Sequence, residues 1–409
     1  MNIAKKLAFL AVLVANSVYA SPDNYELTQV LIVSRHGLRA PLTDGSNLLT
    51  NATPYKWPHW DTDAGLLTTK GGALEVFMGS YFKQWFVETG LVTKNSCADD
   101  SLFVYTNTMP RTIATGQFFM DGAFPGCRVN IKTQQNKQDH DPLFYQSVKN
   151  KSASFVTDNT KAILGFINDS RLDPSYKKLE QIIDYKNSPD CKERRKCQLS
   201  DEVNVVNLDL GKEPSIEGPL NKSFLIVDAF ILQDYEGFPE KDVAWGKIQS
   251  DSEWKLLARL RNTYIEAAYL QPAVAENIIS PLLSKVSELL PGKMNDGDNK
   301  INVIVGHDTT VGPLIAAMGF NQYELPGQYE KTPIGGKLVF QRWTDKTTKK
   351  DYLKTEYVYQ TTTQMRNLTP LSIQTPPKRV TLSFKGCTVD NNGYCSWDDF
   401  RTVIESLVR

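Results

Sequence analysis

Three short apolar segments predict buried β-strands at widely separated places in the chain. They are QVLIVS (29–34), SLFVYTN (101–107) and INVIVG (301–306). Short runs rich in Val, Ile and Leu are typical of strands that are covered on both faces. Polar residues follow each run directly, so each strand is predicted to end at a polar edge of a sheet.

Amphipathic helices are predicted between and after these strands. Apolar residues recur on one face of residues 70–88, with Thr69 as the expected N-cap and Gly90 as the expected stop. That face comprises Leu74, Phe77, Met78, Tyr81 and Trp85. Further helices are expected at 110–120 and 309–319, each directly after a predicted strand.

The remaining pattern divides the chain into an α/β domain and a smaller, mostly helical domain. Residues 141–264 alternate helical patterns with a polar loop, and we expect them to form an inserted domain that covers the edge of the sheet. The other expected elements are strands at 337–343, 352–360 and 379–384 and a helix at 397–408. The sequence thus predicts an α/β domain, a mixed sheet flanked by helices, built from residues 21–140 and 265–409.

The N-terminus is typical of a secretory signal peptide over residues 1–20. A charged start (MNIAKK) precedes a short apolar run, which ends at the small-residue site Val18-Tyr19-Ala20. The run is too short to cross a bilayer, and no later stretch is apolar enough to serve as a membrane anchor. We therefore expect export and cleavage after Ala20.

Six cysteines in an exported chain indicate disulfide bonds. They lie as three neighbouring pairs: Cys97 and Cys127, Cys191 and Cys197, and Cys387 and Cys395. Pairing of neighbours is the simplest arrangement, because short loops close at the lowest entropic cost and export favours oxidation. A zinc site is the alternative, but no C-x-x-C pair or nearby His supports it.

Arg35, His36 and Arg39 form a dense cationic motif directly after the first strand. Guanidinium groups donate pairs of hydrogen bonds that suit phosphate oxygens. Two cations beside a histidine lower its pKa, which keeps the imidazole neutral and nucleophilic. A neutral imidazole held against an arginine-bound phosphate is set up for in-line attack at phosphorus. The motif therefore predicts a covalent phosphohistidine on His36.

Residues after the other two strands supply the remaining groups of such a site. Open α/β sheets bind ligands at the carboxyl ends of their strands, where the following helices direct free N–H groups. Arg111 is a candidate third cation, with an ordinary surface arginine as the alternative. His307 would donate to a phosphate oxygen, and Asp308 would protonate the leaving alkoxide. Because that role needs a protonated carboxyl group, activity is expected to be highest at acidic pH.

Residues 35–41 (RHGLRAP) match the R-H-G-x-R-x-P signature in full, and together with the distant His307-Asp308 they resemble the histidine acid phosphatases. The likeness covers essentially the whole chain after the signal peptide and is to the phytase-related branch that contains bacterial periplasmic glucose-1-phosphatases. The stretches that carry it are KWP (56–58), LTTKGG (67–72), YEGFP (235–239), TPIGGK (332–337) and FQRW (340–343).

The resemblance implies a role for each motif residue. His36 would be the nucleophile and Asp308 the proton donor. The phosphate would be bound by Arg35, Arg39, Arg111 and His307. The resemblance also implies a periplasmic enzyme without a metal or other cofactor, whose substrate enters between the two domains. Glucose 1-phosphate is the expected substrate, with phytate cleaved at one position. A broader phytase or acid phosphatase of the same family is the alternative.

Two further positions bear on the choice of substrate. Glu236 lies in a segment that matches one lining the substrate pocket of such enzymes. There it would bind sugar hydroxyls and repel a highly phosphorylated substrate, with an ordinary exposed carboxylate as the alternative. Thr310 stands where phytase-like relatives often have Asn, two positions after the catalytic Asp.

Other classes of protein fit the sequence less well. The chain has 46 basic and 46 acidic residues, which argues against a general nucleic-acid or membrane binder. A secreted protein that only captures sugar phosphates would need a broken catalytic motif, and both motifs are intact. A phosphoryl-transferring mutase is disfavoured by export and by the separated His-Asp pair. A small phosphomonoester is therefore the expected partner, and the sequence leaves the oligomeric state open.

Overall fold

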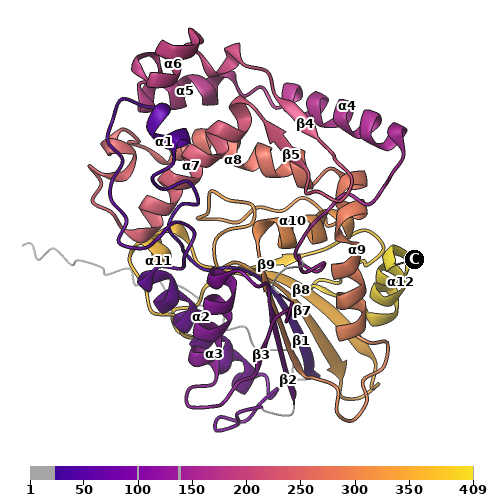
Figure 1. The fold of residues 1–409 in the computed structure, drawn as a ribbon. Coiled ribbons are helices and arrows are strands. Elements are labelled where there is room, and N and C mark those ends of the chain that lie inside the picture. Colours follow the sequence, from indigo (N-terminus) through magenta and orange to yellow (C-terminus); the bar gives the residue numbers. More distant parts are fainter. Residues whose placement is uncertain (1–23, 99–100, 137–139, 409) are drawn as a thin grey trace, which may run out of the picture.

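The computed structural model describes residues 24–98, 101–136 and 140–408, within which a mixed sheet lies beneath a group of helices (Figure 1). The eight described strands of this sheet run in the order β10-β8-β7-β1-β6-β2-β3, and β9 pairs with β8. Their bounds are β1 Tyr25–Arg35, β2 Leu102–Thr106, β3 Ile131–Lys132, β6 Ile301–Gly306, β7 Lys337–Asp345, β8 Asp351–Tyr359, β9 Lys378–Leu382 and β10 Tyr394–Ser396. The predicted signal peptide lies outside the described residues.

The centre of the sheet brings the three predicted apolar strands side by side. β6 runs parallel to β1 on one side and parallel to β2 on the other. The register places Arg35 opposite Gly306 and Thr106 opposite Val305, so the three strands end at the same edge. β1 begins earlier than predicted, because its first residues pair with the end of β7, while the polar or partly exposed Tyr25, Glu26 and Thr28 around the buried Leu27 interrupt the apolar signal.

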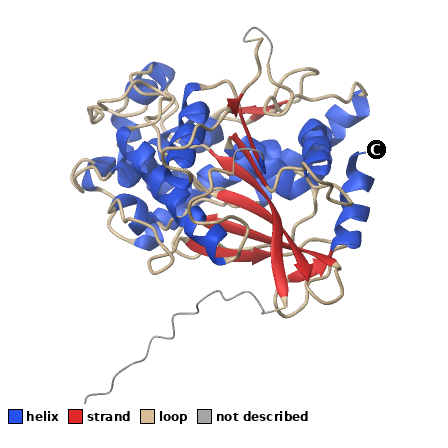
Figure 2. Ribbon diagram, turned by 90° about the horizontal axis from the view of Figure 1, so that it is seen from below, coloured by secondary structure: helices blue, strands red, loops and turns tan. Residues whose placement is uncertain are grey.

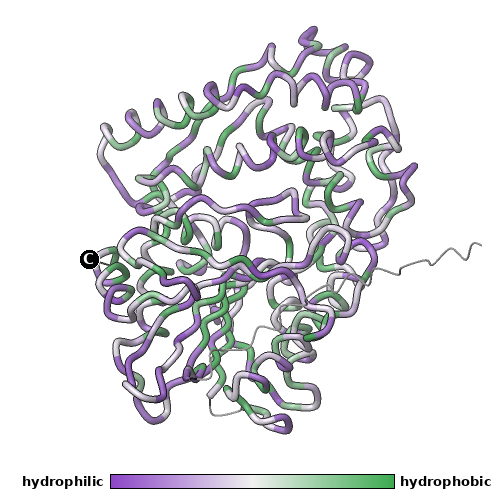
Figure 3. Tube along the Cα trace, turned by 180° about the vertical axis from the view of Figure 1, so that it is seen from behind, coloured by the Kyte–Doolittle hydropathy of each residue, from purple (hydrophilic) through white to green (hydrophobic). Residues whose placement is uncertain are grey.

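Helices cover both faces of the sheet, as predicted (Figures 1 and 2). Because successive side chains of a strand point to opposite faces, β1 contributes to two separate cores. Val30 and Ile32 belong to one buried cluster, with residues of α2 (Thr69–Glu88) and α3 (Pro110–Ala123). Leu31 and Val33 belong to another, with residues of α9 (Pro272–Leu289), α10 (Asp308–Ala317) and α12 (Trp397–Val408). Hydrophobic residues accordingly run along the strands in Figure 3.

The start of α2 differs from the prediction by one residue. Its N-cap is Thr68, whose hydroxyl accepts a hydrogen bond from the Gly71 N–H at 2.9 Å. The predicted cap, Thr69, is the first helical residue instead. Adjacent threonines give the same sequence signal, and only the extended backbone of Thr68 distinguishes them.

Two glycines allow α2 and α3 to pack backbone against backbone. A Cβ atom added at Gly79 would lie 2.0 Å from the carbonyl oxygen of Phe119, and one added at Gly122 would lie 2.1 Å from that of Val76. Backbone atoms of a packed helix cannot move aside as a flexible side chain would. Arg111 lies in the first turn of α3. The close packing of the two helices therefore fixes the backbone position from which the Arg111 side chain extends.

Replacing Gly79 with alanine is expected to lower the free energy of unfolding by about 1–3 kcal/mol, because the added methyl group forces the two helices apart. Urea denaturation measures the effect. Gly165→Ala in α4 (Ala153–Asp169) is the matched control, since its added Cβ meets nothing within 4 Å. There the better helix propensity of alanine should raise the stability by about 0.5–1 kcal/mol. Equal changes in the two variants would contradict the packing argument.

The helices above the sheet form a core of their own (Figure 1). This region contains α4, α5 (Asp173–Ile183), α6 (Pro189–Arg194), α7 (Pro219–Glu236) and α8 (Asp251–Tyr269), and a small antiparallel pair, β4 (Val205–Asn207) and β5 (Ser215–Glu217). The short helices are α1 (Asn47–Asn51), α11 (Thr362–Arg366) and the 3-10 turns Tyr185–Asn187, Leu199–Asp201 and Val243–Gly246. The predicted boundary at residue 264 falls inside α8, and the division into domains stays a prediction. None of the helices in the described ranges is long and apolar enough to cross a membrane.

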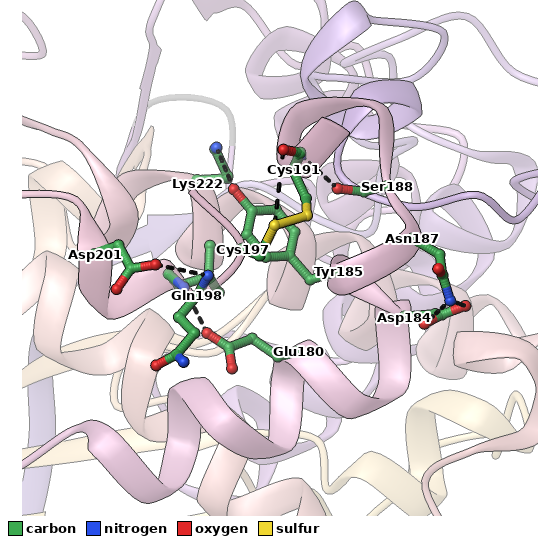
Figure 4. The surroundings of a disulfide bond; sticks show 11 residues. Glu180, Asp184, Tyr185, Asn187, Ser188, Cys191, Cys197, Gln198, Asp201 and Lys222 are labelled. Atoms are coloured by element: carbon green, nitrogen blue, oxygen red, sulfur yellow. Dashed lines mark hydrogen bonds between the residues drawn. A yellow bond between two sulfur atoms is a disulfide. The ribbon is translucent and has the colours of Figure 1, made fainter. Parts of the chain in front are cut away.

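The cysteines pair with their neighbours, as predicted: Cys97 with Cys127, Cys191 with Cys197, and Cys387 with Cys395. The Cys191–Cys197 bond closes the end of α6 beside the ring of Tyr185 (Figure 4). Ser188 caps this helix by accepting a hydrogen bond from the Cys191 N–H at 3.1 Å. The hydroxyl of Tyr185 lies 3.3 Å from the Lys222 ammonium group of α7. These contacts tie the polar loop after α6 to the helical core.

Candidate functional site

The polar residues that follow β1 and β6 meet at the carboxyl edge of the sheet. The His36 N–H donates to the carbonyl oxygen of Gly306 at 2.9 Å, and the Gly37 N–H donates to Thr115 Oγ1 of α3 at 2.8 Å. The imidazole rings of His36 and His307 lie 5.5 Å apart, centre to centre. The convergence predicted from the strand pattern is therefore present, and the loop after β1 is held from both β6 and α3.

His36 is buried and set up as a neutral imidazole. Its Nδ1 lies 2.9 Å from the carbonyl oxygen of Gly37. Since a carbonyl oxygen only accepts hydrogen bonds, Nδ1 carries the proton and Nε2 keeps its lone pair. Burial lowers the pKa of His36 well below its usual value, and the charges of Arg111, Arg35 and Arg39 lower it further. The ring thus stays uncharged, as the motif predicted.

Arg35, Arg39 and Arg111 each present a buried N–H group that lacks a partner. Among the described residues, the Nε atoms of all three have no hydrogen bond. Their terminal nitrogens are partly used: Arg35 Nη1 donates to Glu330 Oε1 at 2.6 Å, and Arg39 Nη2 donates to Asp228 Oδ2 at 3.1 Å. Burial and the charge of Arg39 lower the pKa of Arg111 to about 10, which still leaves it charged. Unpaired buried donors are costly, and three on guanidinium groups indicate a site built for an anion.

His307 has an N–H group close to the arginines of this anion site. The Oδ1 atom of Asn107 accepts the Thr108 N–H at 2.7 Å, so its amide nitrogen is the atom that donates to His307 Nε2, also at 2.7 Å. The proton of the neutral ring then lies on Nδ1, 3.5 Å from Arg111 Nη2. Burial, followed by the charge of Arg111, lowers the pKa of His307 to about 3. Two donors, the Nδ1–H of His307 and an N–H of Arg111, therefore lie next to each other.

Asp308 begins α10 and lies among the arginines. Its Oδ2 is 2.9 Å from Arg261 Nη2 and 3.3 Å from Arg35 Nη2. Burial alone would raise the pKa of Asp308, but the charges of Arg35 and Arg261 outweigh burial and hold it well below the usual value. The carboxyl group is therefore ionised in this structure, and not protonated as the predicted acid role requires.

Three charged residues of the site were missed by sequence reasoning: Asp228 of α7, Arg261 of α8 and Glu330 in the loop before β7. Arg261 donates from Nε to Asp228 Oδ1 at 3.3 Å and from Nη2 to Glu330 Oε1 at 2.8 Å. Asp228 does carry a signal, because it is the one charge in the apolar run 224–232. Among the described side chains, no group of three or more His, Cys, Asp or Glu residues is arranged to hold a metal ion.

The two residues predicted to bear on substrate choice lie in different surroundings. Glu236 ends α7 half-buried, and its Oε2 accepts a hydrogen bond from Thr68 Oγ1 at 2.8 Å. Because the Thr68 N–H donates to the Leu38 carbonyl at 3.0 Å, Glu236 lies close to the loop after β1. Thr310 is fully buried, and its hydroxyl accepts the His307 N–H at 3.0 Å. Thr310 therefore orients the start of α10, while the sugar-binding role of Glu236 stays a prediction.

The chain is similar to known phosphatases over most of its length. The family model "Histidine phosphatase superfamily (branch 2)" matches residues 26–358, which contain every site residue described above. Glucose-1-phosphatase from Salmonella typhimurium is 43% identical, with 99% of this chain and 100% of the relative covered. Glucose-1-phosphatase from Providencia rettgeri is 44% identical, with 94% and 93% covered. Among solved structures, the apo form of Hafnia alvei phytase is 31% identical and superposes with a TM-score of 0.87, covering 95% of this chain and 98% of the phytase.

Proposed function

The chain belongs to the histidine phosphatase superfamily (branch 2), and we propose from this premise that it hydrolyses glucose 1-phosphate through a phosphohistidine on His36. The observation that carries the proposal is the neutral imidazole of His36, whose Nε2 keeps a free lone pair. Three arginines with unpaired buried N–H groups lie near it, and their positive charges lower its pKa. A nucleophile and a cationic cradle for phosphate are the two components that phosphoryl transfer needs.

The proposed reaction has two displacements at phosphorus. The donors of Arg35, Arg39, Arg111 and His307 bind the phosphate oxygens and offset the charge that spreads over them in the transition state. Nε2 of His36 attacks phosphorus while the bond to the sugar oxygen breaks, and that oxygen takes a proton from Asp308. Water then attacks the phosphohistidine and gives a proton to the ionised Asp308, the N–P bond breaks, and inorganic phosphate leaves with both His36 and the protonated Asp308 regenerated. The arginines supply the positive charge, so no metal is required.

The charges of the site suggest how Asp308 acquires its proton. Four guanidinium groups (Arg35, Arg39, Arg111 and Arg261) face three carboxylates (Asp228, Asp308 and Glu330), which leaves one positive charge over. A phosphate dianion more than cancels this excess. Its negative charge next to Asp308 raises the pKa of the carboxyl group, so a proton binds together with the substrate. The acid step is therefore favoured at acidic pH.

Glu236 is proposed to select among substrates. A carboxylate beside the phosphate site hydrogen-bonds the hydroxyl groups of a sugar but repels the extra phosphates of phytate. The alternative function, a phytase or broader acid phosphatase, is suggested by the similarity to Hafnia alvei phytase.

Replacing Glu236 with glutamine is expected to raise kcat/KM for phytate relative to glucose 1-phosphate by roughly tenfold, since the amide keeps the hydrogen bonds and removes the like charge. Steady-state kinetics on the two substrates measure the ratio. Glu240→Gln, a nearby exposed carboxylate, should leave the ratio unchanged. If the Glu236 variant also shows an unchanged ratio, the residue does not contribute to selection.

The periplasm is the proposed location. The predicted signal peptide at residues 1–20 and the three disulfide bonds support it, since disulfides persist in oxidising compartments. N-terminal sequencing of the protein from an osmotic-shock fraction should begin at Ser21. Recovery of the uncleaved chain from the cytosol would contradict export.

A substrate panel tests the proposed function directly. Glucose 1-phosphate, phytate and p-nitrophenyl phosphate are each incubated with the protein, with and without a chelator, and phosphate release is followed. We expect glucose 1-phosphate to be turned over best and the chelator to have no effect. Faster release from phytate would favour the alternative function. No release from any of the three would refute a phosphatase.

A further inference from the structure

Arg261 links the charged groups of the site through ion pairs with carboxylates. Its side chain comes from α8 and is 1% exposed. Its ion-pair partners are three carboxylates: Asp228, Glu330 and Asp308. Glu330 also binds Arg35, and Asp228 also binds Arg39. One guanidinium group therefore connects the acid with both arginines of the motif after β1.

We propose that Arg261 is a positioning residue for proton donation: it holds Oδ2 of Asp308, so that the carboxyl group gives its proton to the leaving oxygen from Oδ1. This inference rests on the proposed function and adds to it a residue that acts through Asp308. An arginine suits the role because its planar fork reaches several carboxylates at once, which the single ammonium group of a lysine does not.

The two oxygens of Asp308 differ in their surroundings. Oδ2 faces two guanidinium donors, Arg261 Nη2 at 2.9 Å and Arg35 Nη2 at 3.3 Å. Oδ1 accepts one hydrogen bond, from the Thr309 N–H at 3.0 Å. A proton on Oδ2 would have to displace a charged donor, whereas Oδ1 has a lone pair left for it. The proton is therefore carried on Oδ1, the oxygen that does not pair with the arginines.

The same contact sets the charge balance around the acid. The cations near Asp308 are Arg35, Arg39, Arg111 and Arg261, and His307 is neutral. The other anions that form ion pairs with these cations are Asp228 and Glu330, and Glu213 is a carboxylate outside the ion-paired cluster. Removing the positive charge of Arg261 stabilises the protonated form of Asp308 and so raises its pKa. Since the reaction needs that form, the loss of activity at high pH must then shift to higher pH.

The test compares two substrates as a function of pH. Glucose 1-phosphate has a poor leaving group that needs a proton, whereas p-nitrophenyl phosphate does not. The measured quantity is the ratio of their kcat/KM values, in wild type, Arg261→Lys and Arg261→Met. Substrate ionisation is the same for every variant, so a change in the ratio reports on the enzyme.

Each variant has its own expected result. Arg261→Lys keeps the charge but holds Asp308 less well, and should lower the ratio roughly tenfold without moving its pH dependence. Arg261→Met should also lower the ratio. In this variant the pH at which the ratio falls should be higher than in wild type by about 1–3 units. Loss of a buried charge that serves three carboxylates destabilises the fold, and if Arg261→Met does not fold, the ratio in Arg261→Lys decides alone.

Arg379→Lys is the matched control, because the side chain of Arg379 is also buried, at 3% exposed, but pairs with Glu356 inside the sheet. It should leave the ratio unchanged. If the Arg261 variants slow both substrates equally and leave the ratio and its pH dependence as in wild type, the residue is only structural and the inference is wrong. If wild type releases no phosphate from either substrate, the proposed function fails instead.

Discussion

Changing His36 to alanine is expected to lower the turnover of glucose 1-phosphate on the order of 10⁶-fold, the scale seen when a nucleophile is removed from an enzyme. The reason is specific to the geometry described above. Nε2 of His36 is an uncharged nitrogen with a free lone pair, and the other candidate, His307, has its Nε2 occupied by the amide of Asn107. No neighbouring imidazole can therefore take over the attack. Phosphate release at saturating substrate measures the effect.

A matched histidine separates loss of the nucleophile from general damage. The side chain of His59 is 87% exposed and lies 3.6 Å from Asp61 at the surface, so His59→Ala should retain wild-type activity. Labelled substrate quenched at alkaline pH, where phosphohistidine survives, should show a phosphorylated protein in wild type and in the His59 variant but not in the His36 variant. Substantial turnover by His36→Ala would end the nucleophile assignment.

Asp308→Ala is expected to slow glucose 1-phosphate by about 10²–10⁴-fold, the usual contribution of a general acid. The same change should slow p-nitrophenyl phosphate far less, because nitrophenolate leaves without a proton. In wild type the activity on glucose 1-phosphate should fall as pH rises through the pKa that Asp308 has with phosphate bound. Below that pKa the carboxyl group is protonated and active, and above it the group is ionised and inactive. Activity on p-nitrophenyl phosphate should depend less on this ionisation.

The kinetic signature must be distinguished from a loss of phosphate binding. Removing Asp308 also frees Arg35 and Arg261 from a carboxylate, so inorganic phosphate should bind at least as tightly to the variant as to wild type. Product inhibition by phosphate measures this. An equal loss of activity on both substrates would argue that Asp308 serves the phosphate site and not the leaving group.

The sequence predicts the sheet edge well because its signal is local. The apolar run 301–306 matches β6 at both ends, and the residues that follow it begin α10 as expected. His36, Arg35 and Arg39 belong to one contiguous motif, and the motif itself specifies the charge environment that lowers the pKa of His36. Local patterns of this kind report on strand ends without any knowledge of the tertiary fold.

The acid network could not be predicted in the same way because its members are brought together only by the fold. Arg261 lies on α8 beside the core residues Leu257, Leu260 and Ile265. The sequence of this helix does not indicate which carboxylates Arg261 pairs with. Glu330 lies in a loop without a motif, yet it binds both Arg35 and Arg261. The sequence suggested a protonated Asp308 because the acid role requires it, and it did not show the ion pairs with Arg35 and Arg261 that hold the carboxyl group ionised.

The position of β6 between β1 and β2 has a consequence for how the protein is made. β1 and β2 leave the ribosome early, but the strand that joins them begins only at residue 301 of 409. Until it docks, both early strands expose unpaired backbone edges, which favour association with other chains. Closing such long-range contacts is slow. The edge of the sheet that carries the site therefore forms late in folding. Until most of the chain has been synthesised, its exposed strands need protection from aggregation.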